Sequence, residues 1–233
     1  MTPWDESARR DARVPRAHAY ENARPEVQAL VPSSAKRILD LGCSSGALGL
    51  ALKERQGAQV VGVEIDAEYA SDAAGRLDRV VNADLDELFA DDAGVSALGR
   101  FDCLIAADVL EHLRDPWSVL RRAAEQLDAG APVVVSLPNV RYWETFRELG
   151  LRGTWPRHSE GIFDSTHLRW FTLRDATELL GQAGLAVTQV SPQYRLRPGD
   201  SNSAPQAERF ARTPLRSFLT YQYVIAAVKP SQG

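Results

Sequence analysis

The sequence contains few cysteines, no long apolar run and no excess of basic charge, and each absence excludes a class of protein. The two cysteines, Cys43 and Cys103, suggest neither a disulfide framework nor a metal cluster. No segment approaches the roughly 20 apolar residues that are needed to span a bilayer. Residues 1–14 contain no apolar stretch that could serve as a secretory signal. These absences predict a cytoplasmic protein that does not act in a membrane.

The charge balance argues against nucleic acid as the main partner. The chain has 233 residues, with 27 basic and 31 acidic side chains and a formal net charge of −4, whereas non-specific phosphate binding needs a basic face. Hydrophobic residues make up 44% of the chain and charged residues 25%, which is typical of a globular domain. We therefore expect a polar, mobile N-terminal arm at 1–18, followed by a single domain at 19–233.

Short apolar runs alternate with longer amphipathic stretches along most of the chain. The stretches 47–55, 67–76, 116–127 and 173–183 have the spacing and length of helices. The runs that we expect to be strands are Arg37–Leu41, Gln59–Glu64, Asp78–Val81, Phe101–Ala106, Pro132–Leu137, Leu185–Val190 and Tyr221–Val228. Buried strands that alternate with helices predict an α/β domain with a Rossmann-like, doubly wound sheet covered by helices on both faces.

Two segments interrupt this alternation. Residues 139–171 should form a single crossover between strands, yet they carry seven of the 18 aromatic side chains of the chain. They form either a small satellite core or an insert that covers the substrate. Residues 191–219 include a stretch rich in arginine, proline and serine, which we interpret as a surface excursion before the final strand.

A glycine-rich turn at 42–46 follows the first expected strand, where doubly wound sheets bind ligands. Ser44 occupies the position at which a dinucleotide-binding turn carries its middle glycine, so a nicotinamide oxidoreductase is disfavoured. The turn also lacks the lysine of a phosphate-binding loop. Asp40 lies two residues before the first glycine of the turn, and an anion at that position suits a ligand that carries an ammonium group and no phosphate.

Two further acids each follow a buried strand. Glu64 ends the second expected strand, 24 positions after Asp40, close to the spacing at which a carboxylate binds the hydroxyl pair of a ribose. Asp84 follows the third expected strand, where a carboxylate could accept a hydrogen bond from an adenine amino group. Three acids that each follow a buried strand, in the correct order, favour a nucleoside ligand at this edge of the sheet.

Several segments resemble motifs of the class I S-adenosylmethionine-dependent methyltransferases. ILDLGCSSG at 38–46 resembles the first motif and GVEID at 62–66 the motif that follows it. NADL at 82–85 resembles the adenine-binding acidic motif, and FDCLIAADVLEHLRDP at 101–116 the motif at the fourth strand. YENARPE at 20–26 is similar to a segment of the ubiquinone- and methionine-biosynthesis-like branch. The resemblance implies a seven-stranded sheet of order 3-2-1-4-5-7-6 with the last strand antiparallel, and S-adenosylmethionine as the cofactor, with S-adenosylhomocysteine as its product.

The resemblance also implies which residues hold the cofactor. In that branch an N-terminal helix closes over the cofactor, which makes Tyr20 and Arg24 candidate contacts. Ile65 and Leu85 would enclose the adenine, whose edge Asp84 would contact. The full set of residues expected at the cofactor is Tyr20, Arg24, Asp40, Gly42, Cys43, Ser44, Gly46, Glu64, Ile65, Asp84, Leu85, Ala106 and Asp108.

His112 and His167 are the candidate catalytic residues. Methyl transfer is a direct displacement, in which the protein aligns the nucleophile and, for a hydroxyl acceptor, takes up its proton. His112 follows the fourth expected strand, near the expected position of the methyl group, and His167 ends the aromatic-rich segment. A structural role stays open for both: His112 could bond to the backbone of a turn, and His167 could organise its loop.

A metal-assisted reaction is the runner-up within the enzyme class. Asp108, Glu111 and His112 could share one helix face and hold a cation. The metal-dependent O-methyltransferases carry a further Asp-Asn pair, where this sequence has Pro138-Asn139, so we predict no metal. The sequence also lacks the motifs of nucleic-acid amino-methyltransferases and of protein arginine methyltransferases.

The sequence therefore predicts a methyltransferase that acts on a small molecule, most readily on an oxygen atom. Tyr142, Trp143, Arg169 and Trp170 in the 139–171 segment are the expected substrate contacts, because aromatic and arginine side chains suit a planar or anionic acceptor. N- or C-methylation, or a non-catalytic cofactor-binding protein of the same fold, remain the alternatives. The expected partner is a small-molecule acceptor, with no nucleic acid and no membrane, and a homodimer stays open.

Overall fold

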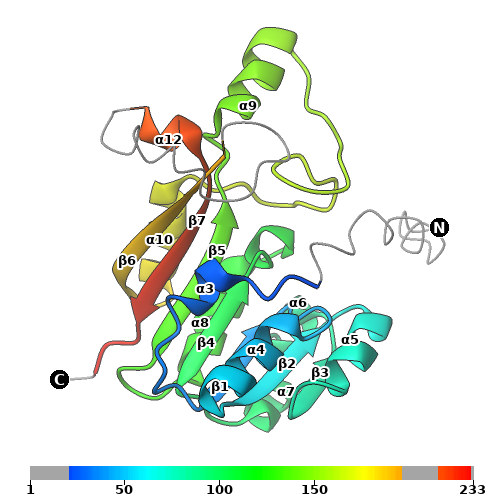
Figure 1. Cartoon of the computed structure of the whole chain (residues 1–233), viewed down its shortest axis with the longest axis vertical. Helices are drawn as coiled ribbons and strands as arrows, with labels where there is room; N and C mark the ends of the chain where they lie inside the picture. Colours follow the sequence, from blue (N-terminus) through cyan, green and yellow to red (C-terminus); the bar gives the residue numbers. More distant parts are fainter. Residues whose placement is uncertain (1–20, 196–214, 232–233) are drawn as a thin grey trace.

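The computed structural model describes residues 21–195 and 215–231. The expected N-terminal arm at 1–18, Tyr20 and most of the expected excursion at 191–219 lie outside these ranges. The described elements, shown in Figure 1, are α3 (Pro25–Gln28), β1 (Arg37–Leu41), α4 (Ala47–Gln56), β2 (Gln59–Glu64), α5 (Ala67–Ala74), β3 (Arg79–Asn82), α6 (Leu85–Leu88), α7 (Asp92–Leu98), β4 (Cys103–Ala107), the 3₁₀ turn η1 (Leu110–His112), α8 (Pro116–Glu125), β5 (Pro132–Pro138), α9 (Trp143–Thr145), the π-helical turn η2 (Phe146–Leu151), α10 (Leu173–Gln182), β6 (Ala186–Tyr194), α12 (Arg216–Leu219) and β7 (Thr220–Val228).

Seven strands form one sheet in the order β3-β2-β1-β4-β5-β7-β6, which confirms the order that the resemblance implied. β1 pairs in parallel with β2 and β4, β2 with β3, and β4 with β5. β7 runs antiparallel to both β5 and β6. The carboxyl ends of the first five strands therefore lie along one edge of the sheet, which is the edge where open α/β sheets bind ligands.

Helices cover both faces of the sheet, as the alternation predicts. In β1, Ile38 belongs to the same buried cluster as Val27 of α3 and Leu52 of α4. The next residue, Leu39, belongs instead to the cluster that contains Leu120 of α8, because successive strand residues point to opposite faces. Figure 1 shows the resulting layers, with α4 and α5 on one side of the sheet and α8 and α10 on the other. No helix in the described ranges is long and apolar enough to cross a membrane.

The strands agree closely with the apolar runs, with one clear extension. β6 continues to Tyr194, beyond the expected end of that run at Val190, and so occupies the first residues of the segment expected to be an excursion. The extension follows from pairing, because β7 runs beside it and Thr220 lies opposite Tyr194. A neighbouring strand supplies a hydrogen-bonded ladder even where the residues do not form an apolar run.

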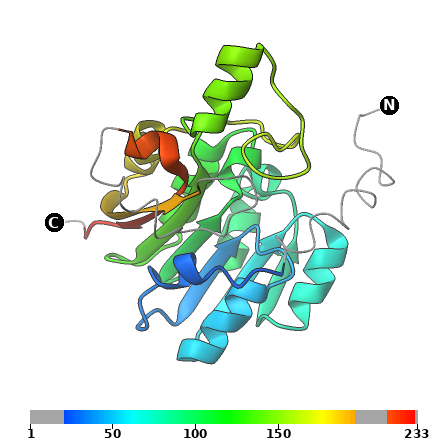
Figure 2. The same ribbon diagram turned by 45° about the horizontal axis from the view of Figure 1, so that its top comes forward.

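Residues 139–171 leave the carboxyl end of β5 and fold above that edge of the sheet (Figure 1, Figure 2). Both ends of this insert are fixed by backbone hydrogen bonds. Val140 N donates to Phe171 O at 3.0 Å, and Leu168 N donates to Glu111 O at 2.9 Å. The insert is thereby held against η1, the turn that follows β4.

Candidate functional site

One cavity of about 870 Å³ opens at the carboxyl ends of β1, β4 and β5. Residues that follow these strands form one part of its wall, and the insert forms another. The sequence-predicted residues that line it are Arg24, Asp40, Gly42, Cys43, Ser44, Asp108, His112 and His167. The structure thus brings expected cofactor residues and both expected catalytic histidines around one space. Tyr20 lies outside the described residues.

The turn after β1 brings its backbone to the cavity wall. Gly42 and Gly46 have φ angles of +68° and +82°, and Ser44 between them has a φ of 51°. Gly42 N donates to Val63 O at 2.8 Å, and a Cβ on Gly42 would lie 2.7 Å from Val109 Cγ2. The turn therefore requires glycine at its first position, both for the left-handed backbone and for the close approach of Val109.

Asp40, near the end of β1, is buried and has an unsatisfied oxygen. The residue is 2% exposed, and its Oδ2 has no hydrogen-bond partner among the described residues. Burial raises the pKa of Asp40 to about 7, the nearby Glu64 carboxylate adds to the rise, and Arg24 opposes it. A buried carboxyl oxygen that lacks a partner, in the wall of a cavity, is suited to bind the cationic group of a ligand.

Glu64, at the end of β2, accepts hydrogen bonds from the turn that follows β1 and from the turn that follows β2. Its Oε2 accepts a hydrogen bond from Ser44 N at 2.9 Å, and its Oε1 accepts one from Asp66 N at 2.8 Å. Burial raises the pKa of Glu64, and the two backbone hydrogen bonds oppose that rise. Asp66 in turn caps α5 by accepting from Glu68 N and Tyr69 N. The position of the Glu64 carboxylate is therefore fixed by the backbone around it.

Three other residues expected at the cofactor lie along the same edge, beside the cavity rather than in its described wall. Ile65 is 55% exposed, and Leu85 is buried. Asp84 accepts from Asp86 N at 2.8 Å, and Arg114 Nη2 lies 3.4 Å from it. These residues follow β2 and β3, so they extend the site outward along the sheet edge.

Gly46 and Ala106 have packing roles in this structure. A Cβ on Gly46 would lie 3.2 Å from Ala73 Cα and 3.2 Å from Leu77 Cγ. The position that a Cβ of Gly46 would occupy therefore faces α5 and not the cavity. Ala106 is fully buried in β4. A sequence pattern cannot distinguish a glycine that admits a ligand from one that admits a neighbouring helix.

Arg24 reaches Asp108, and the two side chains belong to a larger polar network. Arg24 Nη1 lies 2.5 Å from Asp108 Oδ2, and its Nη2 donates to Ser136 Oγ at 2.9 Å. Ser136 Oγ donates to Asp108 Oδ1 at 2.6 Å, and Gln222 Nε2 donates to the same oxygen at 2.5 Å. The sequence analysis missed Ser136 and Gln222, although each is a polar residue inside an expected buried strand, and that contrast could have identified them.

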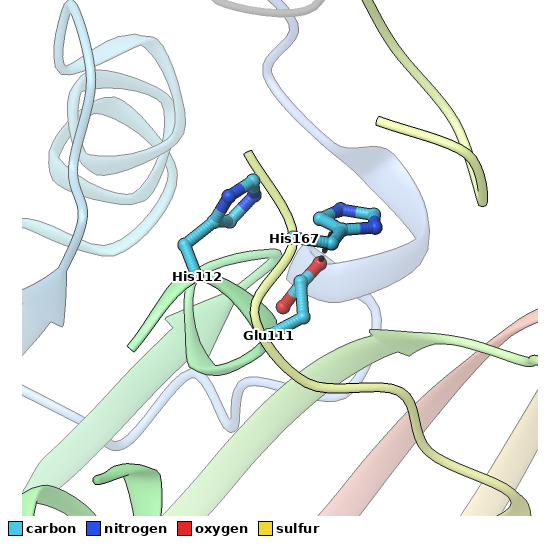
Figure 3. A group of neighbouring side chains, drawn as sticks. All are labelled: Glu111, His112 and His167. Carbon is cyan, nitrogen blue, oxygen red and sulfur yellow. Dashed lines mark ion pairs between the residues drawn. The ribbon is translucent and has the colours of Figure 1, made fainter. Parts of the chain in front are cut away.

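Glu111, His112 and His167 form a cluster beside this network (Figure 3). His167 Nε2 lies 3.9 Å from Glu111 Oε1, and the two imidazole centroids are 4.7 Å apart. One oxygen or nitrogen atom from each side chain lies within 4.8 Å of the other two. Burial raises the pKa of Glu111 well above its ordinary value, and the Asp108 carboxylate adds to that rise. The metal alternative considered Asp108, Glu111 and His112 as ligands. Among the described residues, His167 and not Asp108 completes this group with Glu111 and His112.

His112 is held by a loop of the insert. Its Nδ1 lies 3.0 Å from Thr166 Oγ1 and 3.3 Å from Thr166 O, and Thr166 Oγ1 donates to Asp164 Oδ1 at 2.6 Å. Burial and, to a smaller extent, His167 lower the pKa of His112 to about 4, against an opposing effect of Asp164. The imidazole is therefore neutral at pH 7. Asp164 and Thr166, which lie three positions and one position before His167 in the chain, were not expected at the site.

Tyr142 and Trp143, two of the expected substrate contacts, do not belong to the described wall of the cavity. Tyr142 is fully buried, its hydroxyl donates to Arg195 O at 2.9 Å, and its ring packs edge-on against Tyr221 with centroids 5.5 Å apart. The Arg147 guanidinium lies 4.8 Å from the centroid of the Trp143 ring. These contacts support the satellite core that the sequence analysis left open for this part of the insert.

Arg169 and Trp170, the other two expected substrate contacts, also lie outside the described wall. Arg169 donates to Leu168 O at 2.9 Å. Trp170 is 45% exposed and packs edge-on against Trp155 with centroids 5.5 Å apart. The insert instead lines the cavity with Glu144, His167 and the turn 158–164. That turn has no distinctive composition, so the sequence offered no signal for it.

A sequence model of the family described as "Methyltransferase domain" matches residues 16–190. Among curated proteins, the chain is similar to a ubiquinone biosynthesis O-methyltransferase from Pseudomonas aeruginosa (strain LESB58), with 32% identity over 105 residues. That match covers 45% of this chain and 45% of the relative, and the chain spans about half the length of the curated relatives it matches.

Two solved structures share the fold. A SAM dependent methyltransferase from Archaeoglobus fulgidus is 18% identical, with a TM-score of 0.60 over 92% of this chain and 94% of that chain. A magnesium protoporphyrin IX methyltransferase from Synechocystis PCC 6803, solved with bound SAH, is 16% identical, with a TM-score of 0.59 over 98% of this chain and 90% of that chain. With the family match across most of its length, the chain belongs to the methyltransferase domain family, the class I S-adenosylmethionine-dependent methyltransferases.

Proposed function

We propose that the chain transfers the methyl group of S-adenosylmethionine to a hydroxyl group of a small molecule bound in the cavity. The observation that carries this proposal is that a carboxyl group, with one oxygen unpartnered among the described residues, and two imidazoles belong to residues that line one cavity. Asp40 supplies the oxygen, and His112 and His167 supply the imidazoles. Such a wall suits a cationic methyl donor near the carboxyl group and an acceptor that loses a proton near the imidazoles.

The residues of the sheet edge fit the cofactor. Asp40 Oδ2, which has no hydrogen-bond partner within 21–195 and 215–231, would bind the ammonium group, whereas Glu64 would bind the ribose hydroxyls and Asp84 the adenine amino group. The exposed Ile65 side chain would be covered by the adenine ring, which removes apolar surface from water. When bound, the cofactor supplies a methyl group on a positively charged sulfur, and the chain supplies the alignment.

A hydroxyl acceptor needs a group that takes up its proton, and two side chains in the wall could do so. His112 is neutral at pH 7, because burial lowers its pKa to about 4, so one of its ring nitrogens carries a free electron pair. His167 lies next to it, with ring centroids 4.7 Å apart. Both histidines line the cavity, which supports proton removal next to the transferred methyl group.

A small polar molecule suits the acceptor side of the cavity. The insert contributes Glu144 and the turn 158–164 to the wall, and Arg195 and Tyr221 add a guanidinium and a phenol. The Arg195 guanidinium lies 3.9 Å from the centroid of the Tyr221 ring. The curated relatives carry the name O-methyltransferase, which supports oxygen rather than nitrogen or carbon as the methylated atom.

The test is to incubate the chain with S-adenosylmethionine and a panel of soluble phenols, catechols and primary amines, and to identify methylated products by mass spectrometry. We expect methyl ethers, formed together with S-adenosylhomocysteine. His112→Gln should lower the rate by about 10²–10⁴-fold. Glu54→Gln is the control, because Glu54 is exposed on α4 and is not among the residues that line the cavity. Methylated amines without methyl ethers would contradict the proposal.

A further inference from the structure

We infer that Asp164 and Thr166 are positioning residues that hold His112 as its Nδ1-protonated tautomer, so that His112 Nε2 is the atom that takes up the acceptor's proton. The inference rests on the proposed function, because it names the base of that reaction. It also selects His112 over His167 as that base.

The first observation concerns the carbonyl oxygen of Thr166. His112 Nδ1 lies 3.3 Å from Thr166 O. A carbonyl oxygen can only accept a hydrogen bond, so the nitrogen that faces it must carry the proton. A neutral imidazole has one protonated nitrogen, and the electron pair is then on Nε2.

The second observation concerns the hydroxyl group of Thr166, which has a single proton. Thr166 Oγ1 donates to Asp164 Oδ1 at 2.6 Å, and an ionised carboxylate can only accept. The hydroxyl proton is therefore directed to Asp164, and the hydroxyl must accept from His112 Nδ1, which lies 3.0 Å away. The carbonyl and the hydroxyl thus assign the same tautomer independently.

Asp164 is itself fixed in place. Its Oδ1 also accepts from Thr166 N at 2.8 Å, and Asp164 N donates to Gly161 O at 3.0 Å. The loop is joined to η1 by the hydrogen bond from Leu168 N to Glu111 O. The turn that carries His112 and the loop that positions it are therefore held together by backbone as well as side-chain contacts.

His167 is held by different contacts. Its Nδ1 lies 3.3 Å from Ile162 O, which also requires a proton on Nδ1, and its Nε2 faces Glu111 Oε1 at 3.9 Å. The electron pair of His167 is thus directed toward a buried carboxyl group. The charged and titratable groups that act on His112 are His167, Asp164 and Asp108.

The proton step balances without a further reactant. The acceptor O–H bond breaks, its proton bonds to His112 Nε2, and the electron pair stays on the oxygen that forms the new bond to the methyl carbon. The electron pair of the broken methyl–sulfur bond stays on sulfur. The imidazolium that forms is positive, and the Asp164 carboxylate stabilises it through Thr166 Oγ1. A carboxylate that fixes a tautomer and stabilises an imidazolium has the same part in serine hydrolases.

The tautomer can be measured without turnover. The full chain is labelled with ¹⁵N, saturated with S-adenosylhomocysteine at pH 7, and studied by histidine ring NMR, with His112→Gln to assign the resonances. We expect a proton on His112 Nδ1 in the wild type and in Thr166→Ser, which keeps the hydroxyl. Thr166→Val removes the hydroxyl and Asp164→Asn can reverse the hydrogen-bond direction, so both variants should increase the share of the Nε2-protonated form.

Turnover supplies the second measurement, with catechol as the probe acceptor. We expect Thr166→Val to lower kcat roughly 10-fold or more with KM nearly unchanged, and Thr166→Ser to stay within about threefold of the wild type. A proton on Nε2 of His112 in the wild type would overturn the inference even if catechol is methylated. A reaction that requires an added divalent cation and stops with a chelator would also overturn the inference, because Glu111, His112 and His167 would then bind a metal. The expected tautomer together with methylation of amines alone would overturn only the proposed function.

Discussion

Arg24 Nη1 lies 2.5 Å from Asp108 Oδ2, although the two residues are 84 positions apart in the chain. Both have left-handed backbones, with φ angles of 50° and 53°, and such backbones cost a residue other than glycine about 1–2 kcal/mol. The ion pair and its hydrogen bonds to Ser136 and Gln222 offset that cost. The segment before the first strand is thereby joined to the turn after the fourth.

Arg24→Ala should therefore lower the free energy of unfolding by about 1.5–3 kcal/mol, the range for hydrogen bonds to charged groups, as measured by urea titration. Arg157→Ala is the matched control, because Arg157 is an exposed arginine of the insert and should change stability by less than about 0.5 kcal/mol. Equal losses in the two variants would mean that the Arg24–Asp108 pair contributes nothing.

Glu64→Ala should weaken the binding of S-adenosylhomocysteine by about 1–3 kcal/mol, because charge-assisted hydrogen bonds to the ribose hydroxyls would be lost. Calorimetric titration measures the affinity, and Glu54→Ala, on the exposed side of α4, is the control. Unchanged affinity in Glu64→Ala would place the ribose elsewhere.

The sheet could be predicted from the sequence because its strands are buried apolar runs, and β1 and β2 end where those runs end. The position of Asp40, Glu64 and Asp84 along one edge of the sheet could be predicted for a related reason, since each stands at a fixed place relative to a strand. The insert could not be predicted, because aromatic composition does not separate packing from recognition. Tyr142 is fully buried, and only the folded chain places Thr166 beside His112.

The raised pKa of Asp40, about 7, predicts a specific pH dependence of stability. Between the ordinary aspartate pKa near 3.8 and a pKa of about 7, the folded state binds a proton that the unfolded state has released. Stability from this group is therefore present at low pH and is lost as the pH rises toward 7. Relative to Asp40→Asn, the wild type should lose up to about 1.4 kcal/mol per pH unit between pH 5 and 6, about half as much per unit near pH 7, and almost nothing above about pH 8. Urea titrations at four pH values measure the difference, and parallel pH profiles would contradict it.

Two aromatic residues of the insert should respond differently to truncation. Tyr142→Ala should cost about 3–5 kcal/mol of unfolding free energy, because it removes a fully buried ring. Tyr142→Phe should cost only about 1 kcal/mol for the hydrogen bond to Arg195 O. Trp170→Ala, at a side chain that is 45% exposed, should cost clearly less than Tyr142→Ala. A large loss of turnover in Tyr142→Phe with unchanged stability would instead assign Tyr142 to the substrate.

A crystal structure of the chain with S-adenosylhomocysteine tests the central claim most directly. The account predicts electron density for the ammonium group at Asp40, for the ribose hydroxyls at Glu64 and for the adenine between Ile65 and Leu85. The sulfur atom should face the part of the cavity that His112 lines. Density with the ribose away from Glu64, or with the sulfur directed away from His112, would contradict the account.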